Sequence, residues 1–213
     1  MQLMDLSQTL ERGMTVFPGA PEATFEKVGN LDEGDSYSLT KFSMTTHVGT
    51  HIDCNSHTKL GGFTTDSQDI SFFAGQGIVI DCSQYGEKMI IGMEVLEDYD
   101  ITGKEYILFH TGWDRYWTEE NFWADYPVLS DDLLEYLSND QTVKGIGVEY
   151  GSIDDVNNST LSKHGVFLKN EKVVIENLTN LACLLEKEFV FMALPLKFKN
   201  GDGSPIRAVA IVD

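Results

Sequence analysis

The chain has 213 residues, and 34 Asp and Glu against 15 Lys and Arg give it a formal net charge of −19. A surface this acidic repels phosphate backbones and anionic lipid headgroups, so nucleic acid and anionic membranes are not expected partners. Apolar residues make up 42% of the chain and charged residues 23%, which is typical of a globular protein and excludes the disordered and fibrous classes. One domain over residues 1–213 is the expectation for this length.

Five apolar runs, rich in β-branched or aromatic residues, predict buried strands along the chain. They cover residues 78–80, 106–109, 144–150, 189–197 and 205–213. Segments with helical spacing lie between some of them, and this alternation predicts an α/β fold with mixed layers of sheet and helix. The order of the strands in the sheet does not follow from this pattern.

Leucines at helical spacing predict two main helices. Ser130 is expected to cap the first, because acidic residues then occupy the first turn at the positive end of the helix dipole. The second is expected over residues 178–186, with Asn177 as its cap. A shorter helix is expected over residues 93–97.

The cysteines and the chain ends indicate a soluble, cytoplasmic protein. Cys54, Cys82 and Cys183 are too few and too far apart for a disulfide framework, and their odd number suits a reducing compartment. The N-terminal residues have no basic segment followed by an apolar one, so no signal peptide is expected. The most apolar run, residues 189–196, is far shorter than the roughly 20 residues of a membrane-spanning helix.

The segment T-H-V-G-T-H-I-D-C-N-S-H, residues 46–57, carries three of the five histidines. Its residues of metal-binding type share odd numbers: His47, His51, Asp53 and His57. On an extended chain these side chains point to one side. Imidazoles and a carboxylate suit Zn²⁺, Mn²⁺ or Fe²⁺. The alternative, histidines that cap strands or lie solvated on the surface, is weaker for four such residues than for one.

A straight strand cannot bring these side chains to one ion. At about 3.3 Å per residue, His47 and His57 would lie about 33 Å apart, whereas ligand atoms lie about 2.0–2.2 Å from a metal. The chain must therefore bend, and Gly49 is the natural hinge because glycine adopts any backbone angle freely. We expect a turn or helical fragment around Gly49, followed by an extended segment.

A second group of candidate ligands lies downstream, in S-K-H-G-V-F-L-K-N-E-K-V-V-I-E-N. His164 and Glu176 are 12 residues apart, and Glu176 ends an apolar run and precedes a predicted helix. A carboxylate there can bind a cation or accept amide hydrogen bonds, and for Glu176 alone the second role is the ordinary one. Together the two groups hold four of the five histidines, which favours one site with one or two metal ions.

Other reactive residues have competing interpretations. Cys54 and His57 could form a thiol nucleophile and its base, but on an extended segment they point to opposite sides, and we expect Cys54 to be buried. His110 ends an apolar strand and is expected to terminate it rather than face a site. The three tryptophans within residues 113–123 are expected to pack in the core or at an oligomer interface.

The motif H-V-G-T-H-I-D-C-N-S-H resembles the HxGTHxDxPxH signature of the metal-dependent cyclase-like hydrolases, a family that includes bacterial kynurenine formamidase and isatin hydrolase. The resemblance extends along most of the chain. It includes the D-L-S opening with its aromatic-Pro-Gly turn, then H-T-G-W, S-I-D, H-G-V-F-L-K-N, V-V-I-E-N-L-T-N-L and the closing G-D-G-S-P-I-R-A-V-A-I-V-D. It implies a swivelling β/β/α fold and a homodimer or homotetramer.

The resemblance also implies a role for each matching residue. The positions that match metal ligands are His47, His51, Asp53, His164 and Glu176. Asp53 and Glu176 would touch both of two metals, and His57 would donate or accept a proton. Phe17 would line the substrate pocket, although by residue type it is as readily an ordinary core aromatic.

The implied activity is hydrolysis of an amide C–N bond by water that Zn²⁺ or Mn²⁺ activates, with His57 as acid and base. The implied partner is a small aromatic amide, such as the N-formylkynurenine of tryptophan catabolism. The alternatives are isatin-like lactam hydrolysis, a cyclase or dehydratase reaction of the same family, and metal or small-molecule binding without turnover.

Four positions depart from the family pattern. Asn55 replaces the motif proline, Ala20 follows Pro-Gly where Asp is frequent, His110 precedes T-G-W where Arg is common, and Glu149 stands where Asp is usual. None is a ligand position, so the metal assignment is unaffected. Any of the four that lines the pocket would change the substrate.

Overall fold

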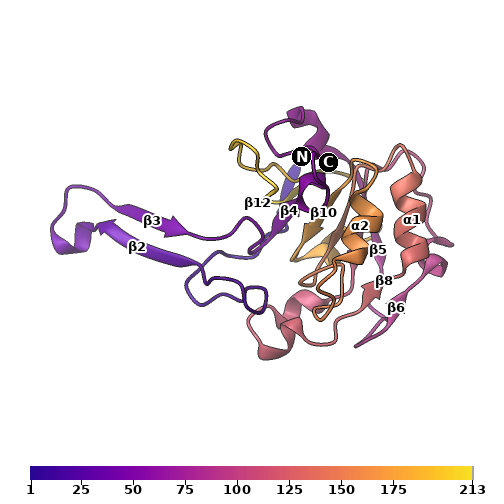
Figure 1. Cartoon of the computed structure of the whole chain (residues 1–213), viewed down its shortest axis with the longest axis horizontal. Helices are drawn as coiled ribbons and strands as arrows, with labels where there is room; N and C mark the ends of the chain where they lie inside the picture. The colour runs from indigo at the N-terminus through magenta and orange to yellow at the C-terminus, as the bar shows by residue number, and fades with distance from the viewer. Residues whose placement is uncertain (213) are drawn as a thin grey trace.

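The computed structural model describes residues 1–212, and its main feature is a nine-stranded mixed sheet (Figure 1). In spatial order the strands are β1 (Gln2–Asp5), β13 (Val209–Val212), β11 (Phe189–Met192), β5 (Ala74–Asp81), β7 (Tyr106–His110), β9 (Gly145–Val148), β10 (Val173–Glu176), β4 (His51–Asp53) and β12 (Gly203–Pro205). The central strands β5, β7, β9 and β10 are parallel, and the flanking pairs are antiparallel. The predicted mixed α/β architecture is confirmed.

Two α-helices, α1 (Asp131–Asn139) and α2 (Ser162–Leu168), pack against each other beside the sheet (Figure 1). Helix α1 begins as predicted, because the Leu133 backbone N–H donates to Ser130 Oγ at 3.2 Å. Within residues 1–212, neither α-helix has the length or the hydropathy that a bilayer crossing requires. The remaining helical turns are of the 3₁₀ type: η1 (Leu31–Glu33), η2 (Asn55–His57), η3 (Ile70–Phe73), η4 (Met93–Leu96), η5 (Trp113–Tyr116), η6 (Glu120–Trp123) and η7 (Leu181–Leu184).

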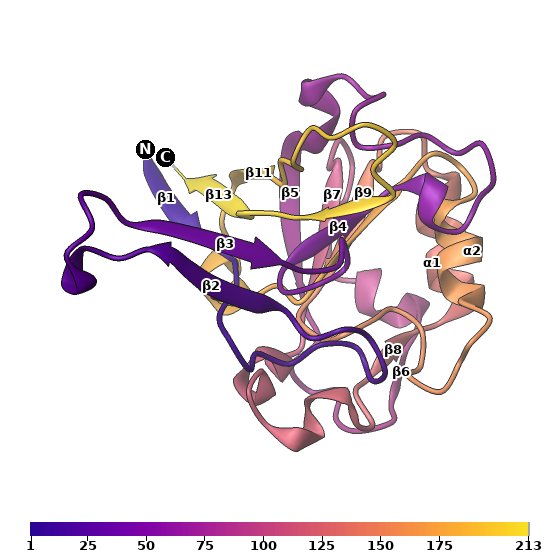
Figure 2. The same cartoon turned by 60° about the vertical axis from the view of Figure 1, so that its left-hand side comes forward.

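A hairpin of β2 (Thr24–Gly29) and β3 (Leu39–Ser43) projects from the body of the molecule in both views (Figures 1 and 2). It forms a two-stranded sheet of its own. A further small parallel pair joins β6 (Ile90–Ile91) to β8 (Val128–Leu129).

The side chains of the main sheet alternate between two apolar clusters. On β7, Ile107 and Phe109 lie in a cluster with residues of α1 and α2, whereas Tyr106 and Leu108 lie in a second cluster. This alternation follows from the two-residue period of a strand, so the clusters lie on opposite faces. A strand that is buried on both faces has apolar residues at successive positions. This explains why these strands could be predicted from apolar runs in the sequence.

The strands predicted over 144–150, 189–197 and 205–213 are shorter in the structure, whereas β5 and β7 extend beyond the predicted 78–80 and 106–109. The strand expected over 189–197 ends at Met192, before Pro195 makes only an isolated bridge to Ile206. The strand expected over 205–213 is β13 within the described residues, and Pro205 belongs instead to β12. Proline has no N–H for a central ladder, which fits the position of Pro205 in β12 at the edge of the sheet.

The predicted helix over 178–186 is wrong. Only the short turn η7 forms there, because Leu178 donates its backbone N–H to Val148 O at 2.9 Å and so extends the sheet contacts. Asn177 does not cap a helix, since its φ of 58° places it in the left-handed region. The helix expected over 93–97 is likewise only the 3₁₀ turn η4.

Candidate metal centre

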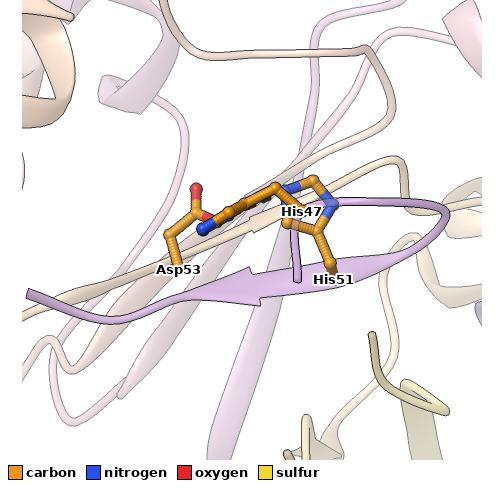
Figure 3. A group of neighbouring side chains, drawn as sticks. All are labelled: His47, His51 and Asp53. Atoms are coloured by element: carbon orange, nitrogen blue, oxygen red, sulfur yellow. Dashed lines mark hydrogen bonds and ion pairs between the residues drawn. The ribbon is translucent and has the colours of Figure 1, made fainter. Parts of the chain in front are cut away.

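Strand β4 presents two of the predicted ligands on one side and an apolar residue on the other. His51 and Asp53 lie two residues apart, so both point to the site, while Ile52 between them lies in the second apolar cluster. His47 lies in the preceding loop, and Figure 3 shows its side chain together with those of His51 and Asp53. The local segment thus supplies three candidate ligands with a common direction.

The chain bends between His47 and β4 at the predicted hinge. Gly49 has a φ of +62°, and a Cβ at this position would lie 2.3 Å from Leu10 Cδ2. The left-handed backbone angle favours glycine here, whereas the end of the flexible Leu10 side chain could move aside. The bend returns His47 Nδ1 to 2.5 Å from Asp53 Oδ1, which confirms the expected turn and extended segment.

The second group of candidate ligands, Glu176 and His164, lies beside the first because of the pairing of β10 with β4 and the position of α2. Strand β10 runs antiparallel to β4 and pairs Glu176 with His51, while α2, which was not predicted, carries His164. His164 Nε2 lies 3.2 Å from Asp53 Oδ2 and 3.3 Å from Glu176 Oε1. The five residues that the sequence nominated as ligands are therefore brought together.

Asp53 and Glu176 each direct one carboxylate oxygen to His51 and the other to His164. His51 Nε2 lies 3.3 Å from Asp53 Oδ1 and 3.4 Å from Glu176 Oε2, and His164 approaches the other oxygen of each carboxylate. A tetrahedral ion with bonds of about 2.1 Å has ligand atoms about 3.4 Å apart. The donor set fits divalent ions in two sets of three, His47 with His51 and Asp53, and Asp53 with His164 and Glu176.

Burial makes these charges costly without a cation. Asp53 is 1% exposed, and within residues 1–212 neither Lys nor Arg pairs with it or with Glu176. Burial opposes ionisation of Asp53, but the facing His47 and His51 rings hold its pKa well below the usual range. Burial also disfavours charge on His51, yet Asp53 and, to a smaller extent, Glu176 outweigh this and raise the pKa of His51 to about 10. The centre attracts positive charge strongly.

His57 lies beside this group on the turn η2. Its ring centroid is 4.0 Å from that of His47 and 5.7 Å from that of His164. The side chain is 23% exposed and lines a cavity with the candidate ligands. Burial lowers the pKa of His57, so its neutral form is favoured, as a proton acceptor requires.

The cavity has a volume of about 280 Å³ and an aromatic wall. Phe17 and Trp123 form this wall, with ring centroids 5.4 Å apart and planes at 76°. Phe17 is 39% exposed, so it is not an ordinary core aromatic. Trp123, expected only in the core or at an interface, packs against the core and lines the cavity as well.

Cys54 does not take part in this site. Its side chain is fully buried in the second apolar cluster, as expected. Burial raises the pKa of the Cys54 thiol to about 12. A thiol in this environment is not ionised near neutral pH, which excludes the thiol-nucleophile alternative.

Three of the four departures from the family pattern have structural roles away from the cavity wall. Asn55 Nδ2 donates to Leu168 O and so ties η2 to the end of α2. His110 Nδ1 lies 3.0 Å from Glu149 Oε2, so two departures form one pair. Ala20 alone lines the cavity, so it is the departure that bears on the substrate.

Sequence reasoning missed two carboxylates that contact the candidate ligands. His164 Nδ1 lies 2.7 Å from Asp154 Oδ2, and His47 Nε2 lies 2.9 Å from Asp202 Oδ2. Both belong to segments that carry the family resemblance, S-I-D and G-D-G-S-P. Their place in those segments could have marked them as candidates for the site. The spacing of residues in the sequence did not indicate which side chain either of them would contact.

Comparison with known proteins assigns the family. The family model named Cyclase matches residues 4–155, which is most of the chain. The chain belongs to the Cyclase family. Kynurenine formamidase of Erythrobacter litoralis is 30% identical over 208 residues, covering 98% of this chain and 93% of that protein. Kynurenine formamidase of Bacillus cereus is also 30% identical, over 97% of this chain and 95% of its own.

Solved structures share the fold of this Cyclase family member. Isatin hydrolase A from Ralstonia solanacearum matches with a TM-score of 0.86 and 23% identity, over 100% of this chain and 92% of that one. A structure described as a predicted metal-dependent hydrolase from Bacillus stearothermophilus matches with a TM-score of 0.79 and 21% identity, over 98% and 97%. The expected cyclase-like fold is confirmed.

Proposed function

We propose that this chain is a metal-dependent hydrolase that cleaves the C–N bond of a small aromatic amide, with an aryl formamide such as N-formylkynurenine as the first substrate to test. One observation carries the proposal. Asp53 and Glu176, both buried, each direct one oxygen to His51 and the other to His164. The 30% identity to two kynurenine formamidases over nearly the whole chain supports the choice of substrate.

The donor set fits Zn²⁺ or Mn²⁺, and the two sets of ligands support two ions rather than one. His47, His51 and Asp53 would hold the first, and Asp53, His164 and Glu176 the second. Such ions supply Lewis acidity, which polarises a carbonyl and lowers the pKa of water toward about 7. Metal analysis of the purified protein decides which ion is bound and how many.

His57 is placed to move the proton that the reaction requires. Hydrolysis breaks the amide C–N bond, joins a water oxygen to the carbonyl carbon and transfers a proton to the leaving nitrogen. Burial lowers the pKa of His57 and so favours its neutral form, and the side chain borders the cavity beside His47 and His164. It can therefore take a proton from water and return it to the nitrogen, as an acid and base in turn.

The aromatic wall suits a planar substrate. Phe17 and Trp123 line the same cavity as the histidines, and their rings offer apolar and edge-to-face contacts to an aryl group. The volume of about 280 Å³ accommodates a compact ligand. Ala20 lines the cavity with a small, uncharged side chain. The aspartate that is frequent at this position in the family would be larger and would add a negative charge.

The experiment is a hydrolysis screen of metal-free and metal-loaded protein. N-formylkynurenine, simple aryl formamides and isatin are offered to the protein with Zn²⁺ or Mn²⁺, and the amine or acid product is measured. The proposal requires turnover that disappears with a chelator and returns with the ion. Metal binding without turnover on any amide would instead favour a binding protein.

A lactam such as isatin is the second candidate substrate. The fold agrees with isatin hydrolase A at a TM-score of 0.86, and the aromatic wall suits a bicyclic ring as well as an aryl formamide. A lactam leaves one ring-opened product, whereas a formamide releases formate. Measurement of formate in the same screen separates the two reactions.

We also propose that a second copy of the chain covers the projecting hairpin, in a homodimer or homotetramer. All five residues of β3 are exposed, among them Leu39 at 52% and Phe42 at 58%. An isolated two-stranded hairpin is marginal in water unless another surface covers it. Light scattering is expected to show an oligomer that L39K weakens, while L60K, at a residue fully exposed elsewhere, does not.

A reducing compartment and a single domain remain predictions. Cys54 and Cys82 are buried free thiols, which supports the cytoplasm as the location; fractionation of cells tests it. A single domain over residues 1–213 predicts one cooperative unfolding transition for the metal-free protein.

A further inference from the structure

Each candidate histidine ligand has one ring nitrogen toward the carboxylates and the other on an outer partner. His51 directs Nε2 to Asp53 and Glu176, while its Nδ1 lies 2.9 Å from Gly49 O. His164 likewise directs Nε2 inward and Nδ1 to Asp154. Outer partners of this kind select the tautomer and orientation of a ligand histidine. The arrangement is therefore that of a prepared metal centre.

His47 has the reverse orientation, and its outer partner is Asp202. Its Nδ1 faces Asp53 at 2.5 Å, and its Nε2 lies 2.9 Å from Asp202 Oδ2. His47 is also the least buried of the candidate ligand histidines, with a side chain that is 22% exposed. Because it lies in a loop rather than on a strand, it depends most on an outer partner for its position.

The fold holds Asp202 directly beside β4. Its backbone carbonyl accepts a hydrogen bond from the Cys54 N–H at 2.9 Å, and the next residue, Gly203, pairs with Asp53 across the strands β12 and β4. A Cβ on Gly203 would lie 2.5 Å from His47 Cε1. Glycine thus lets the chain that carries Asp202 approach the His47 ring closely.

We propose that Asp202 is a positioning residue for the metal centre. Its carboxylate accepts the Nε2–H of His47 and so leaves Nδ1 as the ring nitrogen that binds the ion shared with His51 and Asp53. The inference rests on the proposed metal centre and adds a residue to it. It also assigns the ligand atoms: Nδ1 for His47, but Nε2 for His51 and His164.

Asp202 also lies near His57, so the alternative is that Asp202 itself binds an ion. The same Oδ2 is 3.8 Å from His57 Nδ1, and His47, His57 and Asp202 could in principle hold an ion of their own. His47 Nδ1 faces the buried Asp53, however, whereas the Asp202 side chain is 45% exposed. A buried carboxylate between several imidazoles is the stronger site for the ion.

The test compares D202A and D202N with D132N in the metal-free full-length protein. Asp132 is exposed on α1, so D132N removes the same charge at a distance. Zn²⁺ affinity and stoichiometry are measured by competition with a chromophoric chelator. The absorption spectrum of the Co²⁺-loaded protein reports coordination geometry, and the melting temperature of the metal-free protein reports a purely structural effect.

D202A is expected to lower the affinity for one of the bound ions by about 10- to 100-fold and to change the Co²⁺ spectrum. D202N, whose amide oxygen can still accept the hydrogen bond, is expected to lie between D202A and wild type, and D132N to match wild type. The metal-free melting temperature is expected to stay unchanged. If D202A does not fold, D202N decides the question by the same measurements.

Three results overturn the inference. Wild-type affinity and spectrum in D202A and D202N would leave Asp202 no role at the metal. A drop of one whole ion in stoichiometry, with the remaining ion unaffected, would make Asp202 a ligand. A lower metal-free melting temperature with unchanged affinity would make it structural. Failure of the wild-type protein to bind Zn²⁺, Mn²⁺ or Co²⁺ would instead contradict the proposed function.

Discussion

Asp53 and Glu149 are buried carboxylates that both face histidines, and they differ in what else surrounds them. Glu149 is 1% exposed and accepts hydrogen bonds from the backbone N–H groups of residues 111, 112 and 181 as well as facing His110. Asp53 is equally buried, but among residues 1–212 its carboxylate has hydrogen-bond and ion-pair partners only in the imidazoles of His47, His51 and His164.

The difference teaches how to distinguish a structural pair from a metal centre built of the same residue types. Backbone donors satisfy Glu149 whether or not His110 is charged, so this cluster needs no ion. Asp53 has no such donors, and its imidazole neighbours can bind an ion through the nitrogens that face it. The surroundings of the carboxylate, rather than the presence of a histidine, indicate the metal.

The largest effect is expected from the Asp53 side of this comparison. D53A removes a carboxylate that both sets of ligands share, so metal affinity is expected to fall by more than the about 100-fold that loss of an outer partner can cost. E149Q is expected to retain full metal content. Elemental analysis after dialysis checks both variants, and a D53A protein that keeps its ions would contradict the comparison.

Replacement of His57 separates catalysis from metal binding. H57A is expected to lower kcat by about 10²- to 10⁴-fold, because it removes the proposed acid and base while leaving the five ligands in place. H110N is the matched control, since His110 contacts Glu149 and does not line the cavity. Steady-state kinetics with equal metal content measures the effect, and an unchanged kcat in H57A would exclude its role.

Replacement of Glu149 is expected to lower the stability of the fold rather than metal binding. E149A leaves two buried backbone N–H groups and one part-buried group without their acceptor, which is expected to cost at least about 2 kcal/mol in the free energy of unfolding. E149Q keeps one acceptor oxygen and should lose less. Urea unfolding of the metal-free protein measures both, and equal stability of E149A and wild type would show that the donors find other acceptors.

The smallest effect is the pH dependence of the His110–Glu149 pair. The hydrogen bond to Glu149 raises the pKa of His110 above its ordinary value of about 6.5, although burial opposes this. The folded state therefore binds the proton more tightly, and this stabilisation is complete below about pH 6.5 and is lost as pH rises through the folded pKa. H110N should lose more stability at pH 6 than at pH 9, measured by urea unfolding; a difference that grows with pH would reverse the assignment.

Part of the centre could be predicted from one short segment. The odd-numbered residues of 46–57 share a direction because a strand alternates its side chains, and Gly49 was the one residue able to turn the chain back. His164 and Glu176 were nominated by residue type and by family resemblance, while their distance from Asp53 had no local signal. Asp154 and Asp202 had no predicted role. Asp202 lies 155 residues from His47, and Asp154 lies only ten residues before His164 but on the other side of the start of α2, a helix that was not predicted.

The failed helix over 178–186 shows where local patterns stop being decisive. Its leucines have helical spacing, but Leu178 uses its backbone N–H on Val148 in the sheet. Burial in the second apolar cluster then satisfies the same leucines without a helix. Tertiary contacts outweigh helix propensity, which amounts to only tenths of a kcal/mol per residue, about 0.7 at most for ordinary residues.

The amino-acid sequence by itself determined the alternating faces of the buried strands, the hinge before β4 and the kinds of donor atom available. These features depend on covalent spacing and on neighbouring residues, which the order of amino acids states directly. Only the tertiary structure decided that β10 lies beside β4, that α2 brings His164 to Asp53, and that Asp202 returns to His47. Such contacts depend on strand order and on burial across more than a hundred residues, and no local pattern encodes them.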